Sequence, residues 1–352
     1  SMTQKKIKVL VVDDSMLIRQ LLTQILDADP GIEVVASACD PYEAREKIKI
    51  HHPDVLTLDV EMPKMDGITF LKNLMRLRPM PVVMISTLTE KGAAITLQAL
   101  ETGAVDYLAK PKVGDERGWE NYQSVIVEKV KGAATANVGR AVTEKKSPLS
   151  GSPEKLHGSK VDLIAIGAST GGTEAIKEVV SRLPRQVPPI VVTQHIPPVF
   201  STSYAKRLNQ TVALEVSEVD KSGIELLPEH VYIAPGDQHL TVKKRGNTFV
   251  TQLLDTELVN RHKPAVDVLF QSVLEAAGAR TIGVLLTGMG ADGAKGLKAL
   301  RDGGAYTIAQ DEASSVVWGM PGAAVRLEAA DDIVALPKIP ERLLRKVYAN
   351  KK

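Results

Sequence analysis

Cysteine is nearly absent from this chain of 352 residues, in which Cys39 is the single example. A disulfide framework within one chain is therefore excluded, and a reducing cytoplasm is the simplest expectation. The sequence also lacks any apolar run near the roughly 18 residues that cross a bilayer, so we expect no direct membrane insertion. The net charge is only +2, which argues against a dedicated nucleic-acid binder with a concentrated basic face.

Length and segment order indicate two α/β domains. At 352 residues the chain is long for a single domain. Strand-like runs alternate with helical patterns from residue 5 onward, and we expect residues 4–131 to form a first domain. Five such repeats predict a five-stranded, parallel, doubly wound sheet of the flavodoxin-like kind. The expected strands are 8–14, 32–38, 55–60, 81–86 and 104–108.

Charged and hydroxyl side chains follow the predicted strands of this first domain. Asp13, Asp14 and Asp59 lie at strand ends, where such sheets bind ligands. Three carboxylates in one pocket repel each other unless a cation joins them, and their hard oxygens favour Mg²⁺. Ser86 ends the fourth expected strand and Lys110 follows the fifth, and both could contact a phosphoryl group. Each could also be an ordinary polar strand end, but coincidence accounts poorly for five of them at four strand ends.

Four motifs belong to this arrangement: Val12-Asp13-Asp14-Ser15, residues 58–67 (Leu-Asp-Val-Glu-Met-Pro-Lys-Met-Asp-Gly), Ser86, and Lys110-Pro111. Together they resemble the receiver domain of bacterial response regulators over the first third of the chain. The resemblance implies that Asp59 is the phosphoacceptor, that Asp13 and Asp14 help to hold Mg²⁺, and that a histidine kinase is the phosphodonor. It also implies that Ser86 switches by contacting the phosphoryl group and that Lys110 pairs with it.

A change in composition separates the two domains. Residues 132–159 are rich in Ala, Gly, Ser, Thr and Lys without a sustained apolar period, which predicts a flexible linker. Residues 160–350 predict a second doubly wound α/β domain, and apolar runs around Arg245-Gly246-Asn247 predict an inserted β-hairpin. The expected strands are 161–167, 189–194, 213–219, 231–234, 281–287 and 306–310, and the expected helices are 173–182, 201–209, 264–277, 294–301 and 322–330.

A serine stands in a glycine-rich turn at the start of this second domain. Ser169 follows the apolar run that stops at Gly167, and Gly171 and Gly172 precede a helical pattern. A turn from strand to helix can present a nucleophilic hydroxyl and aim N–H groups at a reacting oxygen. Similar turns also cradle phosphates, although the dinucleotide and Walker patterns both fail here. The turn alone leaves nucleophile and anion-binding site about equally open.

A base and an orienting carboxylate can be sought at the other strand ends. His195 closes the run 190–194, so it can meet Ser169 at one sheet edge. Asp292 follows the buried pattern 282–287 within a glycine-rich loop, although a helix N-cap is its plainer interpretation. A neutral imidazole needs such a carboxylate to fix its tautomer. His230 and His239 are better explained as structural or solvated.

Six further motifs carry a second resemblance: residues 167–172, Gln194-His195, residues 234–240 (Ala-Pro-Gly-Asp-Gln-His-Leu), residues 261–270, residues 286–293 and Trp318-Gly319-Met320-Pro321. They resemble the catalytic domain of chemotaxis protein-glutamate methylesterases, the CheB family. With the receiver in front, the resemblance covers nearly the full chain. It implies that Ser169 is the nucleophile, His195 the general base and acid, and Asp292 its orienter. The order Ser, His, Asp differs from that of α/β-hydrolases.

The resemblance also implies what the protein acts on and how it is controlled. It places Thr170, Met289 and Gly290 at an oxyanion or substrate loop. The implied substrates are γ-glutamyl methyl esters on cytoplasmic helices of methyl-accepting chemoreceptors, and in some relatives also glutamines. Ester hydrolysis through an acyl-enzyme would need no cofactor. Phosphorylation of Asp59 would relieve occlusion of the active site by the receiver domain.

Three alternatives remain open at this point. A transcription factor with an N-terminal receiver would need a helix-turn-helix and a basic face, neither of which the second half offers. A receiver-controlled binding module without catalysis is opposed by the complete set of Ser169, His195 and Asp292. The same esterase could also serve a chemosensory pathway other than motility, which the sequence does not decide.

Overall fold

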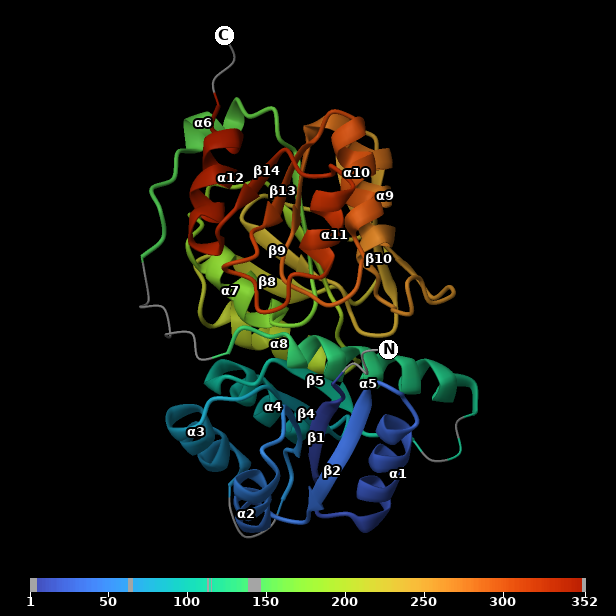
Figure 1. The fold of residues 1–352 in the computed structure, drawn as a ribbon. Helices are drawn as coiled ribbons and strands as arrows, with labels where there is room; N and C mark the ends of the chain where they lie inside the picture. The colour runs from blue at the N-terminus through green and yellow to red at the C-terminus, as the bar shows by residue number, and fades with distance from the viewer. Residues whose placement is uncertain (1–4, 63–65, 113, 115, 139–146, 350–352) are drawn as a thin grey trace. The chain divides into compact units, whose positions relative to one another are not determined.

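The fold is taken from a computed structural model, in which residues 5–62, 66–112, 114, 116–138 and 147–349 are described (Figure 1). The chain divides into two compact units, Ser1–Ala141 and Val142–Lys352. Each unit is an α/β structure with its own parallel sheet. Among the described residues, no helix combines the length and the apolar character needed to cross a membrane.

The first unit is a five-stranded parallel sheet in the order β2-β1-β3-β4-β5, covered by helices on both faces (Figure 1). The central strands β3 and β4 are buried along their whole length, as expected for a sheet with two covered faces. The elements are β1 (Ile7–Val12), α1 (Met16–Asp27), β2 (Ile32–Ala38), α2 (Pro41–His51), β3 (Val55–Asp59), α3 (Gly67–Leu77), β4 (Val82–Ser86), α4 (Glu90–Thr102), β5 (Asp106–Ala109) and α5 (Glu116–Ala134).

Side-chain caps fix where the helices of the first unit begin. Ser15, Asp40, Asp66 and Thr89 each accept a hydrogen bond from a backbone N–H in the first turn of the following helix. Such caps satisfy donors that have no partner within the helix. Helices α1, α2 and α4 therefore begin three or four residues after the strands that precede them, and the polar residues at those strand ends stay at one edge of the sheet.

The second unit has a seven-stranded parallel sheet in the order β14-β13-β12-β6-β7-β9-β8. Its strands are β6 (Leu163–Ala168), β7 (Ile190–Gln194), β8 (Glu215–Glu218), β9 (His230–Ile233), β12 (Thr281–Leu285), β13 (Tyr306–Gln310) and β14 (Asp332–Val334). Strand β6 lies between β7 and β12, so the order of the chain reverses there. Ligands bind at the carboxyl ends of strands beside such a reversal.

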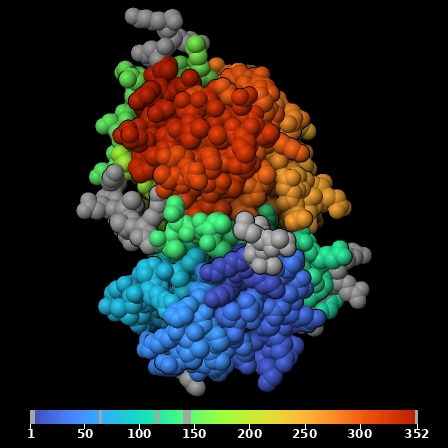
Figure 2. Space-filling view, in the orientation of Figure 1, coloured from blue at the N-terminus to red at the C-terminus, as the bar shows by residue number. Residues whose placement is uncertain are grey.

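Most helices of the second unit connect consecutive strands of its sheet, whereas α6 precedes the first strand. In the space-filling view, the orange-to-red residues from the last part of the chain form a continuous surface over this face of the unit (Figure 2). The helices are α6 (Pro153–His157), α7 (Gly172–Ser181), α8 (Phe200–Asn209), α9 (Val266–Ala277), η1 (Gly278–Arg280), α10 (Ala294–Asp302), α11 (Met320–Arg326), η2 (Leu336–Lys338) and α12 (Ile339–Val347).

The predicted hairpin is present as a separate antiparallel pair, β10 (His239–Arg245) and β11 (Thr248–Leu254). It packs against α9, where Leu240 and Val242 share a buried cluster with Leu269, Phe270 and Val273. The backbone N–H of Val242 also donates to Ser272 Oγ at 3.0 Å. The hairpin therefore holds α9 in place through both apolar packing and a hydrogen bond.

The doubly wound fold predicted from the sequence is confirmed in both units, but the expected linker of residues 132–159 is too long. Helix α5 continues to Ala134, and residues 147–159 pack on the second unit. The Leu149 N–H donates to Arg182 O at 2.9 Å, and the Ser152 N–H donates to the Tyr348 hydroxyl at 3.3 Å. The sequence patterns did not predict α6, β14 or α12, and the helix expected at 322–330 is α11, which runs from Met320 to Arg326.

Close packing between β6 and α9 generates a stability prediction. A Cβ added at Gly167 would lie 2.2 Å from Val266 Cγ1, so Gly167→Ala should lower the free energy of unfolding by about 1–3 kcal/mol. Val266→Ala should absorb most of this penalty when the two substitutions are combined. Urea denaturation of the two single variants and the double variant measures it. Equal destabilisation by Gly167→Ala in both backgrounds would contradict the contact.

Candidate active site

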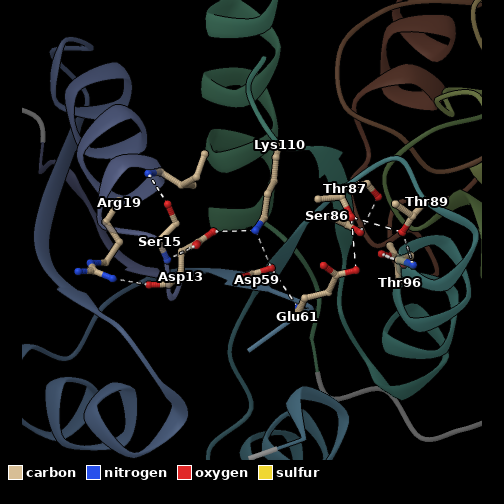
Figure 3. Close-up of polar contacts among 12 residues, drawn as sticks. Asp13, Ser15, Arg19, Asp59, Glu61, Ser86, Thr87, Thr89, Thr96 and Lys110 are labelled. Atoms are coloured by element: carbon tan, nitrogen blue, oxygen red, sulfur yellow. Dashed lines mark hydrogen bonds and ion pairs between the residues drawn. The ribbon is translucent and has the colours of Figure 1, made fainter. Parts of the chain in front are cut away.

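The acidic residues of the first unit meet at the carboxyl edge of its sheet (Figure 3). Oxygen atoms of Asp13, Asp14 and Asp59 lie within 4.8 Å of one another. Lys110, which follows β5, places its Nζ 3.2 Å from Asp59 Oδ1 and 3.6 Å from Asp13 Oδ2. The structure thus brings together the three carboxylates and the lysine that the sequence singled out.

These carboxylates carry more negative charge than their surroundings compensate. Burial raises the pKa of Asp59 to about 7 and the charge of Asp13 adds to the rise, against the opposing effects of the Glu61 N–H and Lys110. Burial also raises the pKa of Asp13. Asp13 Oδ2 and Asp59 Oδ2 are buried and accept no hydrogen bond from the described residues. Such oxygens fit a small hard cation, Mg²⁺ above all.

Ser86 ends β4, next to β3, and is fully buried. Its hydroxyl donates to Thr87 O at 3.1 Å, while Thr87 Oγ1 donates to Glu61 Oε1 at 3.4 Å (Figure 3). A Cβ at Gly92 would lie 2.6 Å from Ser86 Oγ, so the start of α4 packs on this hydroxyl. Residues 63–65, part of the receiver motif, lie outside the described residues.

In the second unit, Ser169 sits in the turn that joins β6 to α7. Its backbone N–H donates to Thr287 O at 3.0 Å, and only 5% of the residue is exposed. The turn is tight because Gly171 takes φ 75° and because a Cβ at Gly172 would lie 2.1 Å from Gln194 Oε1. Gln194 Nε2 in turn donates to Ser169 O at 2.8 Å. The strand pattern alone does not single out Gln194 for this contact.

His195 and Asp292 form a close pair beside this turn. The His195 N–H donates to Ala168 O at 3.3 Å, which sets the histidine next to the residue before Ser169. Its Nε2 lies 2.6 Å from Asp292 Oδ2, and both side chains are buried. Chain positions that are 97 residues apart are thus joined because β7 and β12 both flank β6.

Asp292 accepts four hydrogen bonds. Oδ2 accepts from His195 Nε2 and from the Val266 N–H at 2.7 Å; Oδ1 accepts from Asn260 Nδ2 at 2.8 Å and the Asp267 N–H at 3.0 Å. Burial alone would raise the pKa of this carboxyl, but the hydrogen bond and charge of His195 and the two backbone N–H groups hold it below its usual range. Asp292 is therefore an anion at neutral pH.

The glycine-rich loop after β12 lies against the serine. A Cβ at Gly288 would be 2.8 Å from Ser169 Cβ, and Gly288 O accepts from the N–H groups of Gly319 at 3.0 Å and Met320 at 2.8 Å. Thr170 is buried, and its carbonyl accepts from the Thr287 hydroxyl at 2.9 Å. Met289 and Gly290 follow Gly288 and are half-buried. Gly290 takes a φ of 90°.

The other candidate residues are used elsewhere. His239 is buried between Glu257 O, 2.8 Å from its Nε2, and the Ala265 N–H, 3.2 Å from its Nδ1. Asp237 is exposed and faces Lys263 at 3.9 Å. His262, to which the sequence analysis assigned no function, stacks on His195 with ring centroids 3.6 Å apart and an interplanar angle of 7°.

Comparison with known proteins agrees with this geometry. Residues 164–343 match the family model of the CheB methylesterase, and residues 9–116 match the response regulator receiver domain. A "protein-glutamate methylesterase/protein-glutamine glutaminase" of Hydrogenovibrio crunogenus is 52% identical over 96% of this chain and 98% of its own length. The chain belongs to the CheB methylesterase family.

Further relatives support the same family. The Vibrio vulnificus "protein-glutamate methylesterase/protein-glutamine glutaminase 2" is 54% identical over 97% of this chain and 99% of its own. The crystal structure of the Thermotoga maritima CheB methylesterase catalytic domain superposes with a TM-score of 0.51 at 39% identity, covering 53% of this chain and 98% of that one. The resemblance stated from the motifs is thereby confirmed.

The raised pKa of Asp59 generates a pH prediction for this CheB family member. Between about pH 4, its unfolded-state pKa, and about 7, Asp59 binds more protons in the folded than in the unfolded state. Its contribution to stability therefore falls as pH rises through that window. Without Mg²⁺, Asp59→Asn should raise the free energy of unfolding by about 1–3 kcal/mol at pH 8 and much less at pH 5.

Urea denaturation of the first unit's transition in EDTA at both pH values measures this effect. Asp54→Asn is the matched control, because Asp54 is an exposed carboxylate at the other end of β3 that accepts from the Lys8 N–H at 2.8 Å. An equal gain for both variants, or a gain for Asp59→Asn that does not depend on pH, would contradict the prediction.

Proposed function

We propose that this protein is a phosphorylation-activated hydrolase that converts glutamate methyl esters on chemoreceptors to glutamate. The observation that carries the proposal is the buried His195–Asp292 hydrogen bond at the sheet edge where Ser169 also lies. The names of the relatives, which combine methylesterase with glutaminase, support the substrate class. The receptors' cytoplasmic helices would be the substrate, so we assign the activity to the cytoplasm.

In the proposed reaction, Ser169 Oγ attacks the ester carbonyl carbon while His195 takes up the hydroxyl proton. Since Nε2 is held by Asp292, this proton moves through Nδ1. The bond to the methoxy oxygen then breaks as the imidazolium returns the proton, and methanol leaves. Water adds to the acyl-enzyme with the same ring as base, which releases glutamate and restores the serine. The charge of Asp292 stabilises the imidazolium in both halves of the reaction.

The oxygen that becomes negative in each tetrahedral intermediate needs donors that are already in place. We assign this role to backbone N–H groups of the turn at Thr170 and of the loop at Met289 and Gly290. The contact of Gly288 with Ser169 Cβ supports the assignment, because it sets that loop beside the nucleophile. Close packing of these two loops against each other would keep the N–H groups in place.

The same acyl step accounts for deamidation of glutamine. Attack of Ser169 on the side-chain amide would give the same acyl-enzyme, with ammonia rather than methanol leaving after it receives the proton from His195. Water would then release glutamate as before. We therefore propose that this protein also deamidates receptor glutamines, as the names of its relatives state for them.

We further propose that the receiver controls the esterase through Asp59, which accepts a phosphoryl group from a histidine kinase. The buried, unsatisfied oxygens beside Lys110 support this choice. Mg²⁺ held by Asp13, Asp14 and Asp59 would neutralise phosphoryl oxygens during transfer. The phosphoryl group adds up to about two negative charges, which would draw in Lys110 and the Ser86 hydroxyl and change the surface beyond β4 and β5.

Substitution of the nucleophile and its partner tests the hydrolase. Ser169→Ala should abolish methanol release from methylated receptor membranes, and Asp292→Asn should lower it by about 10⁴-fold because the amide disfavours the required tautomer. Ser181→Ala, which removes a hydroxyl bonded to Glu178 O at the end of α7, and Asp237→Asn are matched controls that should stay near wild type. Near-normal turnover by Ser169→Ala would remove Ser169 from the mechanism.

Regulation is tested by separating the two units. A fragment beginning at residue 147, where the chain already packs on the second unit, should demethylate receptors faster than the unphosphorylated full chain. A small-molecule phosphodonor with Mg²⁺ should stimulate the full chain, should not stimulate its Asp59→Asn variant, and should leave the fragment unchanged. A fragment with the same basal rate as the full chain would show that the receiver does not inhibit.

A further inference from the structure

A tight loop between the hairpin and α9 contacts the catalytic pair. Val259 and His262 exchange backbone hydrogen bonds of 3.0 and 2.9 Å, which closes a turn around Asn260 and Arg261. Both central residues take positive φ, 52° and 69°, a region that suits asparagine better than most residues. The loop thereby brings the His262 ring onto His195 and points the Asn260 side chain toward Asp292.

The Asn260 amide nitrogen lies between two carboxylates. It donates to Asp292 Oδ1 at 2.8 Å and to Asp267 Oδ2 at 2.7 Å, so each of its two hydrogens has an anionic acceptor. Burial raises the pKa of Asp267, and the charge of Asp292 adds to the rise. An amide at this place therefore separates two carboxylates that would otherwise repel each other.

The amide also completes a set of donors around Asp292. Asp292 Oδ2 is fixed by His195 and the Val266 N–H, while Oδ1 is fixed by Asn260 and the Asp267 N–H. Rotation of the carboxylate about its Cβ–Cγ bond would break bonds on both oxygens. Asn260 is exposed and Asp292 is 3% exposed, so the amide stands between the carboxylate and solvent.

We infer that Asn260 is a positioning residue for the esterase: its amide holds the Asp292 carboxylate in the plane that keeps Oδ2 on His195 Nε2. This inference rests on the proposed function. Asn260 does not touch the reacting atoms and acts through Asp292. Asp292 and the stacked His262 both face the His195 ring, and Asp267 is linked to Asp292 through Asn260.

Two substitutions separate positioning from charge. Asn260→Gly keeps a backbone that tolerates positive φ and removes the amide, and it should lower kcat on the order of 10-fold with little change in KM. Asn260→Asp keeps the shape but replaces the donor with a third carboxylate. It should lower kcat further and move the acid limb of the kcat/KM profile to higher pH, since added negative charge favours the imidazolium.

Asn247→Asp is the matched charge control. Asn247 lies in the tight turn of the β10–β11 hairpin. The whole of β10, from His239 to Arg245, separates it from the start of the hairpin, a length of roughly 20 Å at about 3.3 Å per residue. This variant should keep the wild-type rate and pH profile. A shift as large as that of Asn260→Asp would mean that net charge, rather than position, moves the profile.

A double-mutant cycle tests the route through Asp292. If Asn260 acts on Asp292, Asn260→Gly should change the residual rate of Asp292→Asn by less than about 2-fold. An equal loss in the wild-type and Asp292→Asn backgrounds would overturn the inference and leave the loop a merely structural role. Urea denaturation of the second unit's transition checks that each variant is folded, and the glycine variant keeps the test decisive if Asn260→Asp does not fold.

A readout without receptor separates this inference from the proposed function. The rate at which a fluorophosphonate labels Ser169 can be followed against pH in the full chain, and the His195 ring can be titrated by NMR. If the wild-type chain is labelled at Ser169 but releases no methanol from methylated receptors, only the proposed receptor substrate is refuted. Wild-type labelling rates and an unchanged His195 titration in both Asn260 variants would refute the positioning role.

Discussion

The carboxylate of Asp292 anchors two helices as well as one histidine. Helix α9 starts after Ala265, whose methyl side chain cannot accept a hydrogen bond. The first N–H groups of the helix, those of Val266 and Asp267, donate to Asp292 instead. Helix α10 starts after Gly293 with no side-chain cap, and Asp267 Oδ1 accepts the N–H of Gly296 at 2.8 Å. Each helix is thus capped by an aspartate that precedes or begins the other. Since the positive ends of helices favour anions, the same contacts that tie α9 to α10 keep Asp292 ionised beside His195.

This reciprocal capping requires very close approach, which explains the glycines around the site. A Cβ at Gly293 would lie 2.7 Å from both Leu285 Cδ1 and Val266 Cγ1, and its φ of 90° suits glycine. A Cβ at Gly288 would strike Ser169 and Met320. The glycines of this loop therefore let β12, α9 and the nucleophile turn meet at one point. Close packing of backbones therefore sets the loop after β12 directly against the turn that carries Ser169.

The parts of the fold and the site that the sequence predicts are those set by local strand and helix patterns. Parallel sheets gather the carboxyl ends of their strands at one edge, so Ser169, His195 and Asp292 could be brought together from strand patterns alone, as could Asp13, Asp59 and Lys110. Asn260 and His262 could not, because they stand in a loop whose path is set by a hairpin packed on α9, far from any periodic pattern. The predicted linker includes residues 147–159 because they have no apolar period, whereas in the structure hydrogen bonds such as that from Leu149 to Arg182 hold them. Strand β14 was missed because it has three residues, too few to show alternation.

The two units use the same sheet edge with opposite electrostatics. In the receiver, Asp13 and Asp59 are buried, one oxygen of each accepts no hydrogen bond from the described residues, and burial raises the pKa of each. Such oxygens fit a small hard cation, as the proposed transfer of a phosphoryl group to Asp59 requires. In the esterase, Asp292 is also buried, yet it accepts four hydrogen bonds and its pKa lies below the usual range. Both oxygens of that carboxylate are hydrogen-bonded within the fold, so it stays charged and in place, as the proposed proton transfer between Ser169 and His195 requires. The number of hydrogen-bond donors around a buried aspartate, rather than the depth of its burial, therefore decides whether the carboxylate is suited to bind a cation or to remain a fixed charge.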